Sequence, residues 1–157
     1  MHPQFPVKEK IKTLAVSSSA FDNEKFIPSR YSCDGENISP PLSISHVPAE
    51  TKSLAIIVDD PDAPLRTWTH WVVWNIPPAE KIKENSVAGM QGINDFGQNH
   101  YGGPCPPSGT HRYFFKIYAL DDVLELKSSA KKDELEKAMA PHIIAFGELT
   151  GLYKRIR

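Results

Sequence analysis

The chain has 157 residues, of which 40% are hydrophobic, and 18 basic against 19 acidic residues give it a formal net charge of -1. This length fits one packed domain, so we predict a single domain over residues 1–157. The balanced charge argues against a nucleic-acid surface or a cationic membrane patch. The apolar runs are too short to span a bilayer, and residues 1–6 lack a signal-peptide pattern, which favours a cytoplasmic protein without a transmembrane segment.

Fourteen prolines divide the chain into short segments, a pattern typical of β-rich proteins with long ordered loops. Apolar or alternating runs predict strands at 14–17, 42–45, 54–58, 68–76, 112–120 and 148–153. The run at 54–58 is continuously apolar and mostly β-branched, so we expect a central strand buried on both faces. This strand would deliver Asp60 and Asp62 at its end.

Alternation in two of these segments indicates which side chains share a face of a sheet. Within 68–76, the predicted set is Trp68, His70, Val72 and Trp74. Within 112–120, the predicted set is Tyr113, Phe115, Ile117 and Ala119.

One helix is expected after Ser129, a candidate N-cap, and Pro141 should end or kink it. The segment 143–146 fits no single type of element. Together the elements predict a mainly β fold, a β-sandwich of mostly antiparallel strands with one or two peripheral helices.

Two segments place ionisable residues beside prolines and glycines. In the first, Asp60-Pro61-Asp62-Ala63-Pro64 precedes Trp68-Thr69-His70-Trp71, and the second runs from Gly102 to Tyr113. Carboxylates and imidazoles therefore gather in stiff loops at strand ends, which indicates a small pre-formed polar pocket. Taken alone, Asp60 and Asp62 also fit a strand-terminating turn, and His70 also fits a hydrogen-bonded core histidine.

These motifs resemble those of the phosphatidylethanolamine-binding protein family, also called Raf kinase inhibitor-like proteins. Further segments that resemble the prokaryotic branch are 33–42, 94–97 and 147–153. The resemblance implies a β-sandwich with an anion pocket, without the C-terminal helix of animal and plant members. The ligand-binding residues that it implies are Asp60, Asp62, Trp68, His70, Tyr101, Gly103, Pro107, His111 and Tyr113.

We expect the aspartates to bind the imidazoles, and other groups to bind the anion. Each aspartate would accept a hydrogen bond from an imidazole and raise the pKa of that imidazole. The other ring nitrogens, the tyrosine hydroxyls and N–H groups of the glycine-rich loop would then donate to the anion. As an alternative, Asp62 meets an ammonium group such as ethanolamine. The predicted function is non-enzymatic binding of phosphate- or carboxylate-bearing ligands, including phospholipid head groups, without a cofactor or metal.

Three other functions stay open at this point. The resemblance implies inhibition of a serine protease or a protein kinase through loops 20–41 or 94–110, and it also implies a homodimer. A hydrolase would use Ser108, His111 and an aspartate, but the chain has no G-x-S-x-G motif. A zinc or manganese site would use the mixed ligands Asp60, Asp62, His70 and His111. No closely spaced pair of ligands on a helix supports such a site.

The two cysteines, Cys33 and Cys105, are expected to be free thiols in a reducing cytosol. A bridge between them is the alternative, because the family brings both of their loops near the rim of the pocket.

Overall fold

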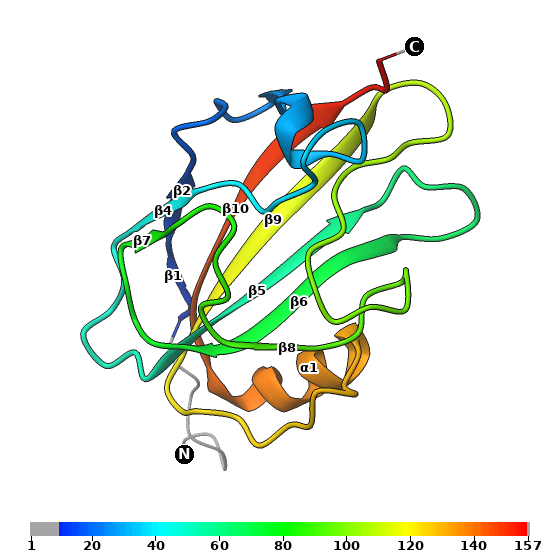
Figure 1. Cartoon of the computed structure of the whole chain (residues 1–157). Helices are drawn as coiled ribbons and strands as arrows, with labels where there is room; N and C mark the ends of the chain where they lie inside the picture. Colours follow the sequence, from blue (N-terminus) through cyan, green and yellow to red (C-terminus); the bar gives the residue numbers. More distant parts are fainter. Residues whose placement is uncertain (1–9, 157) are drawn as a thin grey trace, which may run out of the picture.

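The computed structural model describes residues 10–156 as two β-sheets and one α-helix (Figure 1). The elements are β1 (Lys12–Thr13), β2 (Ala15–Ser17), β3 (Lys25–Phe26), η1 (Ser29–Tyr31), β4 (Leu42–Ser45), β5 (Ser53–Asp60), β6 (Trp68–Ile76), β7 (Lys81–Ile82), β8 (Met90–Gln91), β9 (His111–Leu120), α1 (Lys132–Met139), η2 (Ala140–His142) and β10 (Ile143–Tyr153). Within this range, no helix is long and apolar enough to cross a membrane.

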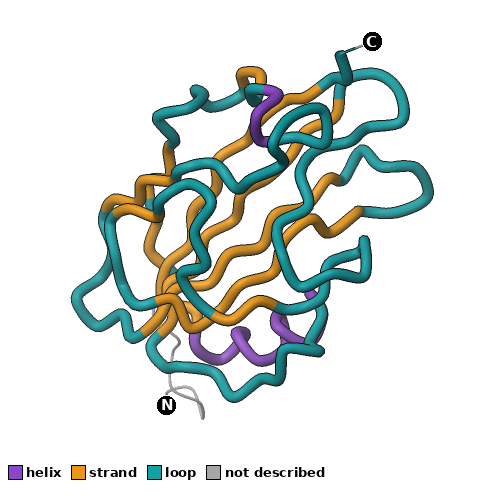
Figure 2. The backbone as a smooth tube through the Cα atoms, viewed as in Figure 1, coloured by secondary structure: helices purple, strands orange, loops and turns teal. Residues whose placement is uncertain are grey.

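The larger sheet has seven strands in the order β1-β10-β9-β5-β6-β8, with β3 also paired to β10, and the smaller sheet has the order β2-β4-β7. Only β1 and β3 run parallel to their neighbour β10, and all other pairs among the described residues are antiparallel. In Figure 2 the strands far outweigh the helices, which are confined to short segments. The predicted mainly β, mostly antiparallel fold is confirmed.

The larger sheet is the middle of three layers, because both of its faces are buried. On one face, Ile56 and Val58 of β5 share a core with Leu42 and Ile44 of the smaller sheet. On the other face, α1 packs over a second core, whose largest member from β6 is Trp74. β5 is buried at all eight positions, as its continuous apolar sequence predicts.

Most predicted strands lie where the sequence places them. Strands 42–45 and 68–76 match, the central strand extends to 53–60, and the ambiguous 143–146 belongs to the long final strand β10. The predicted strand 14–17 is present as β2 from Ala15, one residue later than predicted, because the chain changes sheets at Leu14. β1 pairs with β10, the Leu14 N–H donates to the carbonyl of Phe146, and β2 then pairs with β4.

The predicted N-cap of the helix is also wrong. Helix α1 is capped at Lys131, whose N–H donates to Oε1 of Glu134 at 3.0 Å. Ser129 lies earlier, in a turn closed by the bond from the Ala130 N–H to the Lys127 carbonyl. The helix ends at Met139, before Pro141, as predicted.

A bulge in β6 overturns the predicted face of that strand. Val58 pairs with Trp71, but the next residue of β5, Asp59, pairs with Thr69, so His70 is an extra residue. Val72 and Trp74 face α1 together, as predicted, but His70 consequently lies on the other side, with its ring 5.2 Å from that of Tyr113 in the core between the sheets. The alternation of β9 has no such shift, and its four predicted residues all lie in the core between the sheets.

Candidate functional site

A cavity of about 340 Å³ lies where the loop after β5 meets the loop before β9. Figure 1 shows these two loops beside each other at one end of the larger sheet. The volume falls at the lower end of the range for small-molecule sites, about 300–1,000 Å³. The lining residues are Asp60, Ala63, Pro64, Trp68, His70, Phe96, Cys105, Pro106, Pro107, His111 and Tyr113.

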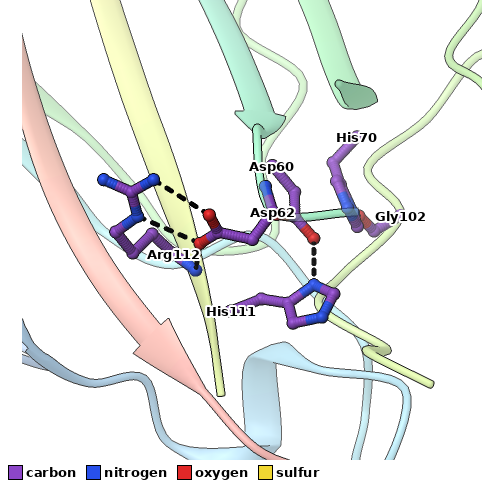
Figure 3. Close-up of polar contacts among 6 residues, drawn as sticks. All are labelled: Asp60, Asp62, His70, Gly102, His111 and Arg112. Atoms are coloured by element: carbon purple, nitrogen blue, oxygen red, sulfur yellow. Dashed lines mark hydrogen bonds and ion pairs between the residues drawn. The ribbon is translucent and has the colours of Figure 1, made fainter. Parts of the chain in front are cut away.

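Asp60 and His111 form the central polar contact of this cavity (Figure 3). Nδ1 of His111 lies 2.7 Å from Oδ2 of Asp60, and both side chains are buried. Because a carboxylate only accepts hydrogen bonds, Nδ1 carries the proton. The second oxygen of Asp60 accepts the N–H of Asp62 at 2.7 Å, which fixes the carboxylate at the strand end. The expected pairing of an aspartate with an imidazole is present here.

Asp62 makes a different contact from the predicted one, and it does not line the cavity. Its carboxylate accepts three hydrogen bonds from Arg112, from the backbone N–H, Nε and Nη2, at 2.8 to 3.0 Å. These bonds to the Arg112 side chain lower the pKa of Asp62. Arg112 follows His111 on β9, so alternation turns its side chain away from the cavity. The charge of Asp62 is thus compensated outside the cavity.

His70 is not paired with an aspartate either. Its Nδ1 lies 2.7 Å from the carbonyl of Gly102, which can only accept, so Nδ1 is the protonated nitrogen. Burial lowers the pKa of His70, with the Gly102 carbonyl as a smaller opposing effect. The expectation of a raised pKa is wrong for this residue. Neutral His70 leaves Nε2 as a hydrogen-bond acceptor.

In the glycine-rich loop, the N–H groups of two glycines donate to other groups of the same chain and do not form the predicted anion nest. The N–H of Gly102 donates to the His70 carbonyl, and the N–H of Gly103 donates to Oδ1 of Asn37 at 2.7 Å. Gly103 lies outside the cavity lining, and a Cβ there would collide with the carbonyl of Tyr31. These N–H groups are therefore not free to hold a ligand.

Two predicted tyrosines lie in different places. Tyr101 lies outside the lining, and its hydroxyl donates to the Tyr31 carbonyl at 2.8 Å. Tyr113 lines the cavity and is only 1% exposed, yet its hydroxyl has no hydrogen-bond partner among residues 10–156. Burial, and then the nearby charge of Asp60, raise the pKa of Tyr113, so the hydroxyl keeps its proton. A buried hydroxyl without a partner is unusual and often marks a site.

The cysteines form a disulfide, so the expectation of free thiols is wrong. Cys33 and Cys105 are bridged across 72 residues, with their Cα atoms 5.5 Å apart. The Cys33 N–H also donates to the carbonyl of Pro104. The bridge ties the cavity loop to the segment after η1, and Cys105 itself lines the cavity.

The sequence interpretation assigned Trp68 and His70 to the cavity but missed Phe96, which completes its aromatic wall. The ring of Phe96 contacts those of Trp68 and His70 edge-on, at centroid distances of 5.7 and 5.3 Å. The buried Asn94 holds this turn, because its Oδ1 accepts the N–H of Phe96. A Cβ at Gly102 would lie 2.7 Å from the Phe96 ring, so this glycine makes room for the wall. A half-exposed phenylalanine in a glycine-bounded loop was the available signal.

Neither alternative reaction site is assembled in the described part of the chain. Asp60 and His111 are joined as the aspartate and histidine of a triad would be, but Ser108 is exposed and no hydrogen bond among the described residues joins it to His111. Among residues 10–156, no group of three or more His, Cys, Asp or Glu side chains is placed to hold a metal ion. The four candidate ligands are divided, because Asp62 faces Arg112 and His70 faces the Gly102 carbonyl.

The sequence model described as phosphatidylethanolamine-binding protein matches residues 17–154. The chain belongs to this family. A UPF0098 protein of Pyrococcus abyssi is 53% identical over 149 residues, which are 88% of this chain and 84% of that protein. Another UPF0098 protein, of Methanothermobacter thermautotrophicus, is 53% identical over 148 residues, which are 89% of this chain and 98% of that protein. The predicted membership of the prokaryotic branch is confirmed.

Solved structures of family members share the fold. A putative homologue from Chlamydia trachomatis has a TM-score of 0.88 at 44% identity and covers 92% of this chain and 99% of its own. Escherichia coli YbcL has a TM-score of 0.84 at 32% identity, with 91% and 99% covered. A carboxypeptidase Y inhibitor, solved with its cognate proteinase, has a TM-score of 0.55 at 16% identity, with 92% and 83% covered, and shares the fold alone.

Proposed function

We propose that this protein binds small carboxylate- or phosphate-bearing anions in the cavity beside Asp60, without performing a reaction on them. One observation carries the proposal. The Tyr113 hydroxyl is buried, keeps its proton and makes no well-formed hydrogen bond within the described residues, although Asp60 and the Cys105 N–H are near it, and it belongs to the lining of an open cavity. An unpaired buried donor costs about 1–3 kcal/mol, which a ligand oxygen would recover.

His111 supports the same ligand chemistry. Its Nδ1–H is held by Asp60, so its Nε2 is the nitrogen that remains for a ligand. When the ring is protonated, Nε2 carries a proton and donates to an anion, and Asp60 stabilises the resulting imidazolium. Tyr113 and His111 are near each other, with ring centroids 6.4 Å apart. Two donors on one wall suit a small oxyanion.

Titration calorimetry with acetate and with inorganic phosphate tests the proposal. We expect Tyr113→Phe to weaken binding, because it removes only the donor hydroxyl. The matched control is Tyr101→Phe, another buried tyrosine, whose hydroxyl bonds to the Tyr31 carbonyl outside the cavity. If neither anion binds the native protein, or if both variants bind like it, the proposed site is wrong.

We also predict that the protein is cytoplasmic, forms a homodimer and has a protease or kinase partner. Light scattering of the purified protein measures the mass in solution and tests the dimer. Incubation with phosphate and carboxylate esters, followed by NMR for released products, tests the absence of catalysis.

A further inference from the structure

The donors available inside the cavity are few. Along the loop from 102 to 107, the N–H groups of Gly102 and Gly103 are used internally, and three prolines have none. The N–H of Cys105 lies beside the Tyr113 hydroxyl. His70 presents an acceptor at Nε2, because its proton is on Nδ1. The side-chain donors that remain on the wall beside Asp60 are the Tyr113 hydroxyl and, when the ring is charged, Nε2 of His111, while Cys105 adds one backbone N–H and Trp68 its indole N–H.

This donor set matches a carboxylate better than a phosphate. A carboxylate has two oxygens and one charge, whereas a phosphate group has more acceptor oxygens and, near neutral pH, up to two charges. Asp60 lies at the same wall and is 3% exposed, so it would repel a second negative charge across a poorly solvated space. Neither nearby arginine lines the cavity, because Arg112 is bound to Asp62, and Arg66 lies over the ring of Trp68 and pairs with Asp95.

The rest of the cavity is apolar. Ala63, three prolines and the rings of Trp68 and Phe96 line it. Phe96 is 42% exposed although it packs edge-on against two rings, so part of its surface is open to a ligand. Apolar and aromatic linings with a few placed polar groups are typical of sites for organic ligands. A bare inorganic ion would leave this surface in contact with water.

We infer that the preferred ligand is an aromatic carboxylate, whose carboxylate meets Tyr113 and His111 while its ring packs against Trp68 and Phe96. This inference rests on the proposed function and narrows its ligand class. Edge-on contacts with the ring add to the burial of apolar surface. Free phosphate and phosphate esters with polar bodies are the weaker ligands.

Calorimetric titrations with benzoate, acetate, inorganic phosphate and benzyl alcohol test the inference near pH ~6, where histidine is largely protonated. We expect benzoate to bind at least about tenfold more tightly than acetate or phosphate, because burial of the ring adds roughly that factor. Phosphate binding as tightly as benzoate would overturn the inference but leave the proposed anion site intact. Benzyl alcohol binding as tightly as benzoate would overturn both, because no anion would be needed.

A matched pair of variants locates the ring of the ligand. Phe96→Ala removes part of the cavity wall, and Phe26→Ala removes a 58% exposed phenylalanine of β3, which does not line the cavity. Neither ring is deeply buried, so both variants should fold. We expect Phe96→Ala to weaken benzoate severalfold more than it weakens acetate, with no change in either affinity for Phe26→Ala. Equal benzoate affinity in both variants would contradict the ring placement.

Discussion

Asp60, at the end of β5, accepts a hydrogen bond from His111, at the start of β9, with 2.7 Å between Oδ2 and Nδ1. β5 and β9 pair side by side, so the end of one strand meets the start of the other. The carboxylate fixes the tautomer of the imidazole and provides the counter-charge for its protonated form. The affinity of the cavity for anions should therefore depend on both residues together.

The variant Asp60→Asn should weaken acetate binding by about tenfold, because Nδ1 of His111 loses the carboxylate that holds it and balances a charged ring. Calorimetry of native and variant protein measures the affinity. Asp62→Asn is the control and should change affinity by less than about twofold, because Asp62 faces Arg112 at the surface. Equal affinities of the two variants would refute the role assigned to Asp60.

Stability should fall as the solution is acidified, partly because of His70. Burial lowers the pKa of His70 in the folded state. Above its ordinary pKa, ~6.5, both states are neutral; below that value the unfolded chain gains a proton that the folded chain does not, so the free energy of unfolding decreases. Urea unfolding at two pH values should show a smaller decrease for His70→Gln, which keeps a donor for the Gly102 carbonyl. An identical decrease in both proteins would contradict this.

Substitution of His111 should affect anion binding, whereas substitution of Trp74 should affect stability. His111→Ala should abolish anion binding and leave the fold largely intact, because His111 lies at the start of its strand and lines the cavity. Trp74 is fully buried under α1, and Trp74→Ala should cost about 3–5 kcal/mol of stability. Thermal melts and acetate titrations of both variants measure the two effects. Unfolding of the His111 variant, with native stability of the Trp74 variant, would invert these roles.

The disulfide should stabilise the protein substantially. The double variant Cys33→Ser/Cys105→Ser frees a loop spanning 72 residues, whose closure corresponds to about 4 kcal/mol in the chain-entropy description. Denaturant unfolding of native and variant protein gives the difference. Addition of a dithiol reductant should lower the stability of the native protein by a similar amount and leave the variant unchanged. A variant as stable as the oxidised native protein would contradict the expectation.

The strands could be predicted because their signals are local, and the apolar run of β5 shows its burial on both faces. An aspartate–histidine contact was expected, but the choice of Asp60 and His111, which are 51 residues apart, depends on the pairing of strands. The bulge at His70 could not be predicted, because alternation assumes an unbroken pairing. The disulfide was judged from the redox compartment expected for the chain, which says nothing about the distance between two loops.

The roles of the loop residues depend on partners far away in the sequence. Gly103 donates to Asn37, 66 residues distant, and Tyr101 donates to Tyr31, 70 residues distant. Glycine content indicates a close backbone approach but not what approaches. In this loop the approaching group is another part of the same chain, so the predicted donors to an anion are already used.

Because His70 is an extra residue in β6, this strand can both pair with β5 and place a side chain in the cavity. If His70 were left out of the pairing, Trp68, Thr69 and Trp71 would alternate as a regular strand does, since Thr69 already pairs with Asp59 and Trp71 with Val58. The pairing of β5 with β6 therefore does not depend on His70, and His70 lines the cavity as an extra residue outside this pairing. A substitution at His70 would therefore change a residue of the cavity lining while Trp71 and Val72 keep their sides of the sheet.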